Sequence, residues 1–198
     1  MQFSRQVHLT ALLLLFAVAA AAQQSATAKS AAPPGIDNDF IQKQFGDTCA
    51  LVPGPLPLKA DLDGDGIEDV VIVARCRNPL PDQAEYNFKV VDPYNTYFGF
   101  GDPKVTTQFA SEDPDRRGVS LLIIHGIGPE AWHAATPKAK FLIINLPFKQ
   151  LATKKMMIHK KSVTAIYAEE AHEGQGAISA LYWDGKKYKY HPMGMSME

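Results

Sequence analysis

Short apolar runs separated by turn residues recur from residue 70 to the end of the chain. Runs of roughly four to eight apolar, β-branched or aromatic residues bounded by Gly, Pro, Asn and Asp are typical of β-strands. Such runs predict seven or eight strands: Val70–Val73, Phe88–Val91, Leu121–Ile124, Phe141–Ile144, Met156–His159, Val163–Tyr167, Ile178–Trp183 and Tyr188–Tyr190. Asp184-Gly185 supplies the positive φ angles of a type I′ hairpin turn between the last two runs. The pattern predicts a mostly antiparallel sheet.

Helical signals are few. Asp37-Asn-Asp39 precedes Phe40 and Ile41, which predicts an N-capped short helix that ends near Gly46. The prolines at 53, 55 and 57 favour an extended backbone after it. Residues 36–198 have the usual size of one domain with a core of its own. The expected fold class is α+β, predominantly antiparallel β, with one or two short helices in a single domain.

The first 22 residues carry the features of an export signal. Arg5 lies near the start, an apolar core runs from Leu9 to Val18, and small residues precede Gln23. This pattern predicts a secretory signal peptide over 1–22, cleaved before Gln23. Residues 23–35 are rich in Ala, Ser and Pro and predict a disordered linker. No later segment has the roughly 20 apolar residues of a membrane span, so we expect a secreted or periplasmic protein without a transmembrane anchor after cleavage.

The charge balance changes this picture little. The whole chain has a net charge of −1, and cleavage before Gln23 removes one arginine and no acid. A nearly neutral chain gives no reason to expect a nucleic-acid or polybasic membrane partner. The partner is expected to be an unknown protein or glycan.

The segment Asp61–Asp69 (DLDGDGIED) is the sharpest chemical signal in the sequence. Four aspartates brought into one turn repel one another unless a cation balances them. Ca²⁺ accepts six to eight oxygen ligands in flexible geometry. The expected ligands are the side chains of Asp61, Asp63 and Asp65, the main-chain carbonyl of Ile67, and Asp69 directly or through water. A solvated acidic turn without a metal is the alternative.

The pattern D-x-D-G-D-G-x-x-D followed by Val70–Val73 resembles the calcium loop of FG-GAP or VCBS-type repeats, known from integrin-like β-propellers. An EF-hand would need a Glu at the twelfth loop position, where this chain has Ile72. A propeller would need roughly 4–8 blades, whereas the loop occurs once here. The resemblance implies a bound Ca²⁺ that stabilises the fold, and it implies no activity.

The two cysteines flank this loop. Cys49 and Cys76 are the only cysteines of the chain, and an even pair in an exported protein favours a disulfide. Two separate buried thiols are the alternative.

Several clusters could carry other chemistry. His125, Glu130 and His133 fall within one segment, but their spacing is not H-E-x-x-H. A hydrolase would need a nucleophile elbow G-x-S-x-G, which the chain lacks. A second cluster is acidic and contains one histidine: Glu169, Glu170, His172 and Glu173. A third cluster is aromatic and either binds a sugar or peptide or packs a loop onto the core: Tyr94, Tyr97, Phe98 and Phe100.

No catalytic residue is therefore assigned from the sequence. The expected function is an exported, calcium-stabilised, non-catalytic binding or envelope module of unknown ligand. The alternative is a secreted hydrolase or inhibitor-like protein that uses the segment His125–His133.

Overall fold

A computed structural model of the chain describes residues 35–100, 113–171 and 176–195. The predicted signal peptide (1–22) and all of the predicted linker except its last residue lie outside the described residues, as do His172 and Glu173. Within the described ranges, no helix has the length and apolar character needed to cross a bilayer.

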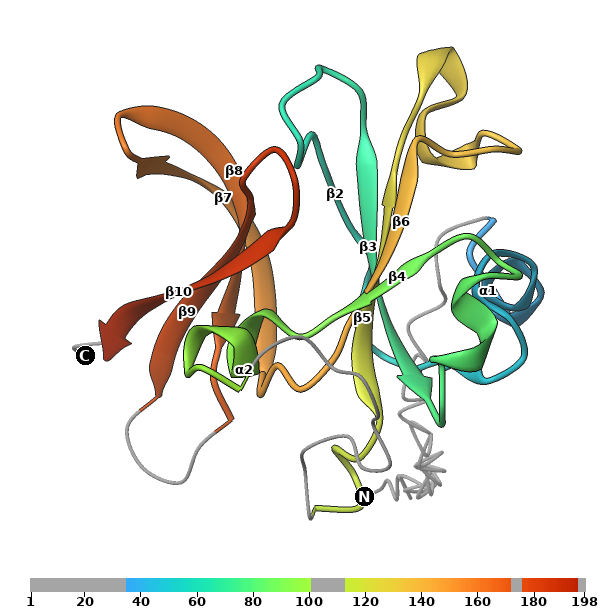
Figure 1. The fold of residues 1–198 in the computed structure, drawn as a ribbon, viewed down its shortest axis with the longest axis horizontal. Helices are drawn as coiled ribbons and strands as arrows, with labels where there is room; N and C mark the ends of the chain where they lie inside the picture. Colours follow the sequence, from blue (N-terminus) through green and yellow to red (C-terminus); the bar gives the residue numbers. More distant parts are fainter. Residues whose placement is uncertain (1–34, 101–112, 172–175, 196–198) are drawn as a thin grey trace, which may run out of the picture.

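Two β-sheets make up most of the described chain (Figure 1). The first has the order β1-β3-β5-β6-β4, with β2 also paired to β3, and the second is a meander in the order β10-β9-β8-β7. Every pair is antiparallel except β4 with β6. The strands are β1 (Cys49–Leu51), β2 (Leu58–Ala60), β3 (Asp69–Cys76), β4 (Lys89–Val91), β5 (Val119–His125), β6 (Ala139–Ile143), β7 (Gln150–Ile158), β8 (Lys161–Glu169), β9 (Ala177–Trp183) and β10 (Tyr188–Met195).

The prediction of a mostly antiparallel β fold with few short helices is confirmed, but the predicted number of strands is wrong. The described residues contain ten strands rather than seven or eight. The predicted runs correspond to β3–β10, and the two additional strands are β1 and β2, of three residues each. Strands this short show no alternation of their own. Both are defined by their pairing with β3, which the local sequence does not reveal.

The first sheet is buried on both of its faces. Val70 and Ile72 of β3 contribute to the core on the side of α1, whereas Val71 and Val73 contribute to the core shared with the second sheet. Strands β5 and β6 alternate in the same way. Figure 1 shows α1 on one side of β3, β5 and β6 and the second sheet on the other. Burial on both faces explains why these strands have continuous apolar runs.

The predicted first helix is confirmed as α1 (Asn38–Phe45). The side chain of Asp37 accepts a hydrogen bond from the Phe40 N–H at 2.8 Å, and Gly46 ends the helix with a φ of 85°. A second helix, α2 (Pro93–Tyr97), and two 3₁₀ helices, η1 (Pro81–Gln83) and η2 (Gly128–His133), are also present.

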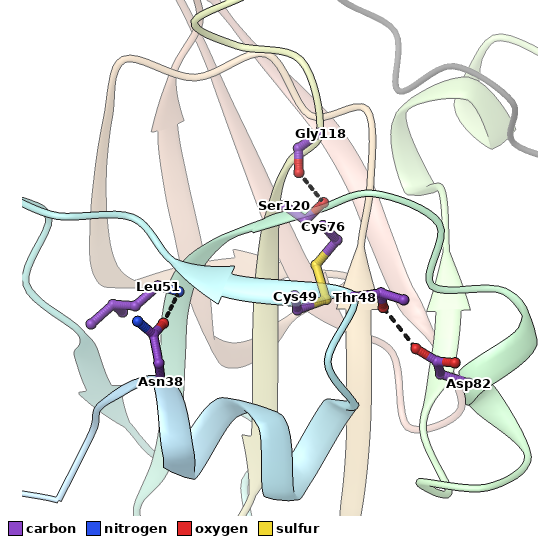
Figure 2. The surroundings of a disulfide bond; sticks show 8 residues. All are labelled: Asn38, Thr48, Cys49, Leu51, Cys76, Asp82, Gly118 and Ser120. Atoms are coloured by element: carbon purple, nitrogen blue, oxygen red, sulfur yellow. Dashed lines mark hydrogen bonds between the residues drawn. A yellow bond between two sulfur atoms is a disulfide. The ribbon is translucent and has the colours of Figure 1, made fainter.

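The disulfide Cys49–Cys76 is formed, which confirms the predicted pairing of the cysteines (Figure 2). The two residues are directly opposite each other in the β1–β3 pair, and their Cα atoms are 4.1 Å apart. Next to the bond, the Leu51 N–H donates to the side chain of Asn38 at 2.8 Å. The disulfide therefore joins β1 to β3, and the hydrogen bond joins β1 to α1.

Replacing Cys49 and Cys76 together with alanine is expected to lower the free energy of unfolding by about 3–4 kcal/mol, because the bond closes a loop with a sequence separation of 27. Urea unfolding of the oxidised protein and of the double variant measures the difference. Reductant should destabilise the parent protein by a similar amount and leave the double variant unchanged. A loss below about 1 kcal/mol would contradict the expectation.

The β7–β8 hairpin extends beyond the sheet to which it belongs. Strand β8 pairs with β9 from Ala165 to Glu169, so the pairs from Lys155–Thr164 to Ile158–Lys161 have no recorded third strand beside them. The turn at its end places His159 at φ 46° and Lys160 at φ 66°. Positive φ at both central positions is the requirement of a type I′ turn, which favours Asn-Gly.

The double substitution His159→Asn, Lys160→Gly is expected to raise the free energy of unfolding by about 1–2 kcal/mol, because side chains such as His and Lys are strained at positive φ. In a domain of this size the midpoint of thermal unfolding should rise by several degrees, at about 2–4 °C per kcal/mol. Scanning calorimetry provides the measurement. A lower midpoint than the parent protein would refute the assignment of strain to this turn.

Candidate metal centre

The loop between β2 and β3 is folded around the side chain of Asp61. Its Oδ1 accepts hydrogen bonds from the N–H groups of Gly64 at 2.7 Å and Asp65 at 3.1 Å, and its Oδ2 accepts from Gly66 at 3.0 Å. Gly64 and Gly66 have φ values of 81° and 85°, which glycine adopts without strain. The two glycines therefore allow the chain to wrap around one carboxylate.

This turn brings three carboxylates together. Ligand oxygens of Asp61, Asp63 and Asp65 all lie within 4.8 Å of one another. In the part of the chain that the structure describes, no other group of three His, Cys, Asp or Glu side chains meets that criterion. The structure thus brings together three of the five predicted ligands.

Lys138 contributes a positive charge to this cluster. Its Nζ lies 2.7 Å from Asp63 Oδ2 and 2.6 Å from Asp65 Oδ2. Lys138 immediately precedes β6, and its N–H donates to the carbonyl of His125 at 3.0 Å. The side-chain hydrogen bonds to Asp63 and Asp65 raise the pKa of the Lys138 ammonium, and the bond to Asp63 has the larger effect. The hydrogen bond from Lys138 is also the main cause that lowers the pKa of Asp65.

Asp69, at the start of β3, has a different environment from the other three aspartates. It is fully buried, and its two oxygens accept hydrogen bonds from the N–H groups of Leu62 and Gly126, each at 2.8 Å. Burial raises the pKa of its carboxyl group to about 6, although both main-chain hydrogen bonds oppose the shift. Asp69 therefore joins the start of the loop to the end of β5. Its coordination of a metal, like that of the Ile67 carbonyl, stays a prediction.

Gly126 explains why the sequence has His-Gly at the end of β5. A Cβ at this position would lie 2.4 Å from the carbonyl oxygen of Glu68, so no larger residue fits without movement of the backbone. The N–H of Gly126 is also the donor to Asp69. The His-Gly pair therefore has a structural role beside the loop.

His125 connects the loop to the second sheet. Its side chain is 1% exposed, and its Nδ1 lies 3.4 Å from Asp63 Oδ2. Its Nε2 lies within hydrogen-bonding distance, 2.7 Å, of the Tyr188 hydroxyl. Burial is the largest cause that lowers the pKa of His125, and burial also raises the pKa of Tyr188. An uninterrupted series of polar contacts thus runs from the acidic loop to β10.

The predicted group of His125, Glu130 and His133 is not assembled into a metal-type cluster among the described residues. His133 stacks on the ring of Trp132 with centroids 3.5 Å apart, and Glu130 is exposed. Glu170 of the second acidic group is buried and accepts a hydrogen bond from the Tyr190 hydroxyl at 2.5 Å.

The aromatic cluster packs mainly against β10. Tyr94, Tyr97 and Phe98 contact the ring of Tyr190 at centroid distances of 5.2, 5.2 and 6.2 Å. Tyr97 and Phe98 remain 53% exposed in spite of these contacts, and Phe100 is 80% exposed. The cluster therefore attaches α2 and Phe98 to the second sheet through Tyr190 and also leaves aromatic surface exposed.

Several contacts at the loop were not predicted from the sequence. Lys138 makes one of them, and Glu68 makes another, because its Oε1 accepts a hydrogen bond from the Trp132 indole N–H at 3.0 Å. In both cases the partner is brought near by the pairing of β3 with β5 and of β5 with β6. A lone lysine or tryptophan more than 60 positions away gives no local signal of such a contact.

The residues present fit a hard divalent cation with one rearrangement. Carboxylate oxygens are the ligands that such ions prefer. Asp61 Oδ2 accepts a single N–H and keeps a second lone pair, whereas Asp61 Oδ1 accepts two. The Lys138 ammonium now contacts Asp63 Oδ2 and Asp65 Oδ2, so a metal bound there would displace it. The Lys138 side chain is 43% exposed, which leaves it room to turn towards water.

Lys138→Met is expected to lower the free energy of unfolding by about 0.5–1 kcal/mol in chelator at low ionic strength, because Asp63 and Asp65 lose their shared counter-charge. The loss should shrink in 1 M NaCl, where salt screens the carboxylates. Urea unfolding at the two salt concentrations tests this. An equal loss at both would show that packing of the lysine stem, and not its charge, is responsible.

Comparison with known proteins gives no relative of this chain. No protein-family model matches it, and no curated protein or solved structure matches it significantly. The resemblance of Asp61–Asp69 to FG-GAP or VCBS-type loops rests on the residues of the loop.

Proposed function

We propose that the chain is an exported, non-catalytic binding or envelope module whose loop Asp61–Asp69 binds one Ca²⁺ for structural stability. The observation that carries this proposal is the convergence of Asp61, Asp63 and Asp65 within 4.8 Å. The FG-GAP or VCBS-type spacing of the loop supports the same conclusion.

The position of the loop supports a structural role for the ion. The loop leads directly into β3, which is buried on both faces and pairs with β1, β2 and β5. A cation that holds the loop therefore stabilises the strand on which both cores depend. Ca²⁺ is preferred over Mg²⁺ because it tolerates irregular oxygen geometry, whereas Mg²⁺ requires a near-ideal octahedron.

The hydrolase alternative receives no support from the described contacts. His125 is buried against Tyr188 and Asp63, and the N–H of Gly126 is directed to Asp69. Neither group is available to a substrate in this arrangement.

Thermal melts of the exported chain in chelator, in 10 mM Mg²⁺ and in about 10 mM Ca²⁺ test the proposal. With an affinity of about 10⁻⁴–10⁻³ M, typical of extracellular modules, Ca²⁺ should add about 1.4–2.7 kcal/mol. The midpoint should then rise by roughly 3–10 °C, and Mg²⁺ should have a much smaller effect. A midpoint that does not respond to Ca²⁺ would refute the metal site.

Two double variants distinguish Ca²⁺ binding at the loop from a general effect of net charge. Asp63→Asn with Asp65→Asn should abolish the shift caused by Ca²⁺, while Asp113→Asn with Asp115→Asn, in another acidic turn, should retain it. Lys138→Met should increase the shift, because Ca²⁺ no longer competes with the ammonium. If both asparagine pairs lost the shift equally, the ion would be acting through net charge.

A further inference from the structure

The end of the β7–β8 hairpin combines exposed lysines with an exposed apolar side chain. Residues 155–164, named here the β7–β8 arm, pair with each other beyond the last β8–β9 pair. Figure 1 shows this hairpin curving away from the body of the molecule. One face of the arm is packed, because Met156, Ile158 and Val163 lie in a cluster with Ala165 and Ala180, and the other face, which carries Met157, has no part in that cluster.

The arm is strongly basic. Lys155, Lys160 and Lys161 are exposed, and the sequence contains no Asp or Glu between Glu130 and Glu169. The nearly neutral balance of the whole chain conceals this local concentration, because the acids are concentrated in the first half of the domain. A surface of this kind attracts anions within about a Debye length.

An apolar side chain, Met157, lies on the same face of the ribbon as Lys155, whereas Lys161, which pairs with Ile158, lies on the other face. Met157 is 66% exposed, one of the most exposed large apolar side chains among the described residues. It pairs across the hairpin with Ser162, so no apolar partner covers it in the ribbon. Exposed apolar residues flanked by lysines are the composition by which surface-bound segments enter the boundary between headgroups and acyl chains.

The turn of the arm has His and Lys at two positions where the backbone favours Asn and Gly. His159 and Lys160 both have positive φ. In the other hairpin of the same sheet, glycine takes the one positive-φ position, Gly185 at φ 96°. Asp184 is not at positive φ, so the type I′ turn predicted for Asp184-Gly185 is wrong. Backbone strain of this kind concentrates at functional positions.

We propose that the β7–β8 arm binds the surface of an anionic phospholipid bilayer, with its lysines at the phosphates and Met157 in the interfacial region. The cations are lysines rather than arginines, and lysine acts as a point charge without the planar geometry that selects one bidentate partner. Mobile headgroup phosphates fit such point charges. The bilayer is proposed as the partner of the envelope module described above, so this proposal rests on that proposed function.

Co-sedimentation of the exported chain (23–198) with phosphatidylcholine vesicles, with and without phosphatidylglycerol, tests the proposal in chelator. We expect binding only to the anionic vesicles and a loss of binding as salt rises. One lysine near such a surface changes the partition coefficient about fivefold. Lys155→Gln, Lys160→Gln and Lys161→Gln together should therefore weaken binding about 100-fold, whereas Met157→Ser should weaken it about fivefold without altering its salt dependence.

A matched variant removes the same charge from exposed positions outside the arm: Lys43→Gln, Arg77→Gln and Lys89→Gln. It should bind almost as well as the parent protein. An equal loss in both triple variants, or equal binding to neutral vesicles, would overturn the proposal. Retention on immobilised heparin without vesicle binding would also overturn it, in favour of a polymeric anion.

The variant His159→Asn, Lys160→Gly separates binding from stability. It should unfold at a higher temperature than the parent protein and yet bind vesicles about fivefold more weakly, since it lacks one lysine. Unchanged vesicle binding by this more stable variant would count against the arm. Because chelator is present, the outcome does not depend on whether Asp61–Asp69 binds Ca²⁺, and the calcium melts test that question separately.

Discussion

Strand β3 is the constraint on which the other elements depend, because it is buried on both faces and begins with a buried carboxylate. The Asp69 oxygens accept the N–H groups of Leu62 and Gly126, so the start of the strand is held to the acidic loop and to the end of β5. A buried carboxylate with two main-chain partners is expensive to disrupt, since both donors would remain unpaired. The loop is consequently positioned by the core and not only by its own turn.

The polar contacts around the loop continue this coupling across the molecule. Lys138 enters between two aspartates from the start of β6, and His125 extends the contacts from Asp63 to Tyr188 of β10. Each sheet therefore supplies a group to the same region. A change in the positive charge that balances the loop carboxylates therefore alters contacts in both sheets. For this reason, one cation bound at the loop would stabilise the whole domain.

Much of the fold could be predicted from the sequence, because its strands are buried and its turns contain characteristic residues. The apolar runs predicted β3–β10, Asp37 predicted the start of α1, and the two cysteines predicted the disulfide. The strands β1 and β2 were missed because pairing with β3 defines them. In the candidate site, the turn of three aspartates was accessible from spacing, whereas Lys138 depends on strand pairing between distant segments. The buried hydrogen bonds of Asp69 have the same origin.

The position of β7 at the rim of its sheet has a consequence for self-association. The other outer strand, β10, is interrupted by Pro192 and a register shift, and both features discourage pairing with a foreign strand. Strand β7 has nine residues, no proline, and one recorded partner, β8. Lys154 and Lys155 are exposed on it, and like charges brought together by two such edges repel each other. The lysines of this strand thus oppose edge-to-edge pairing between copies of the chain.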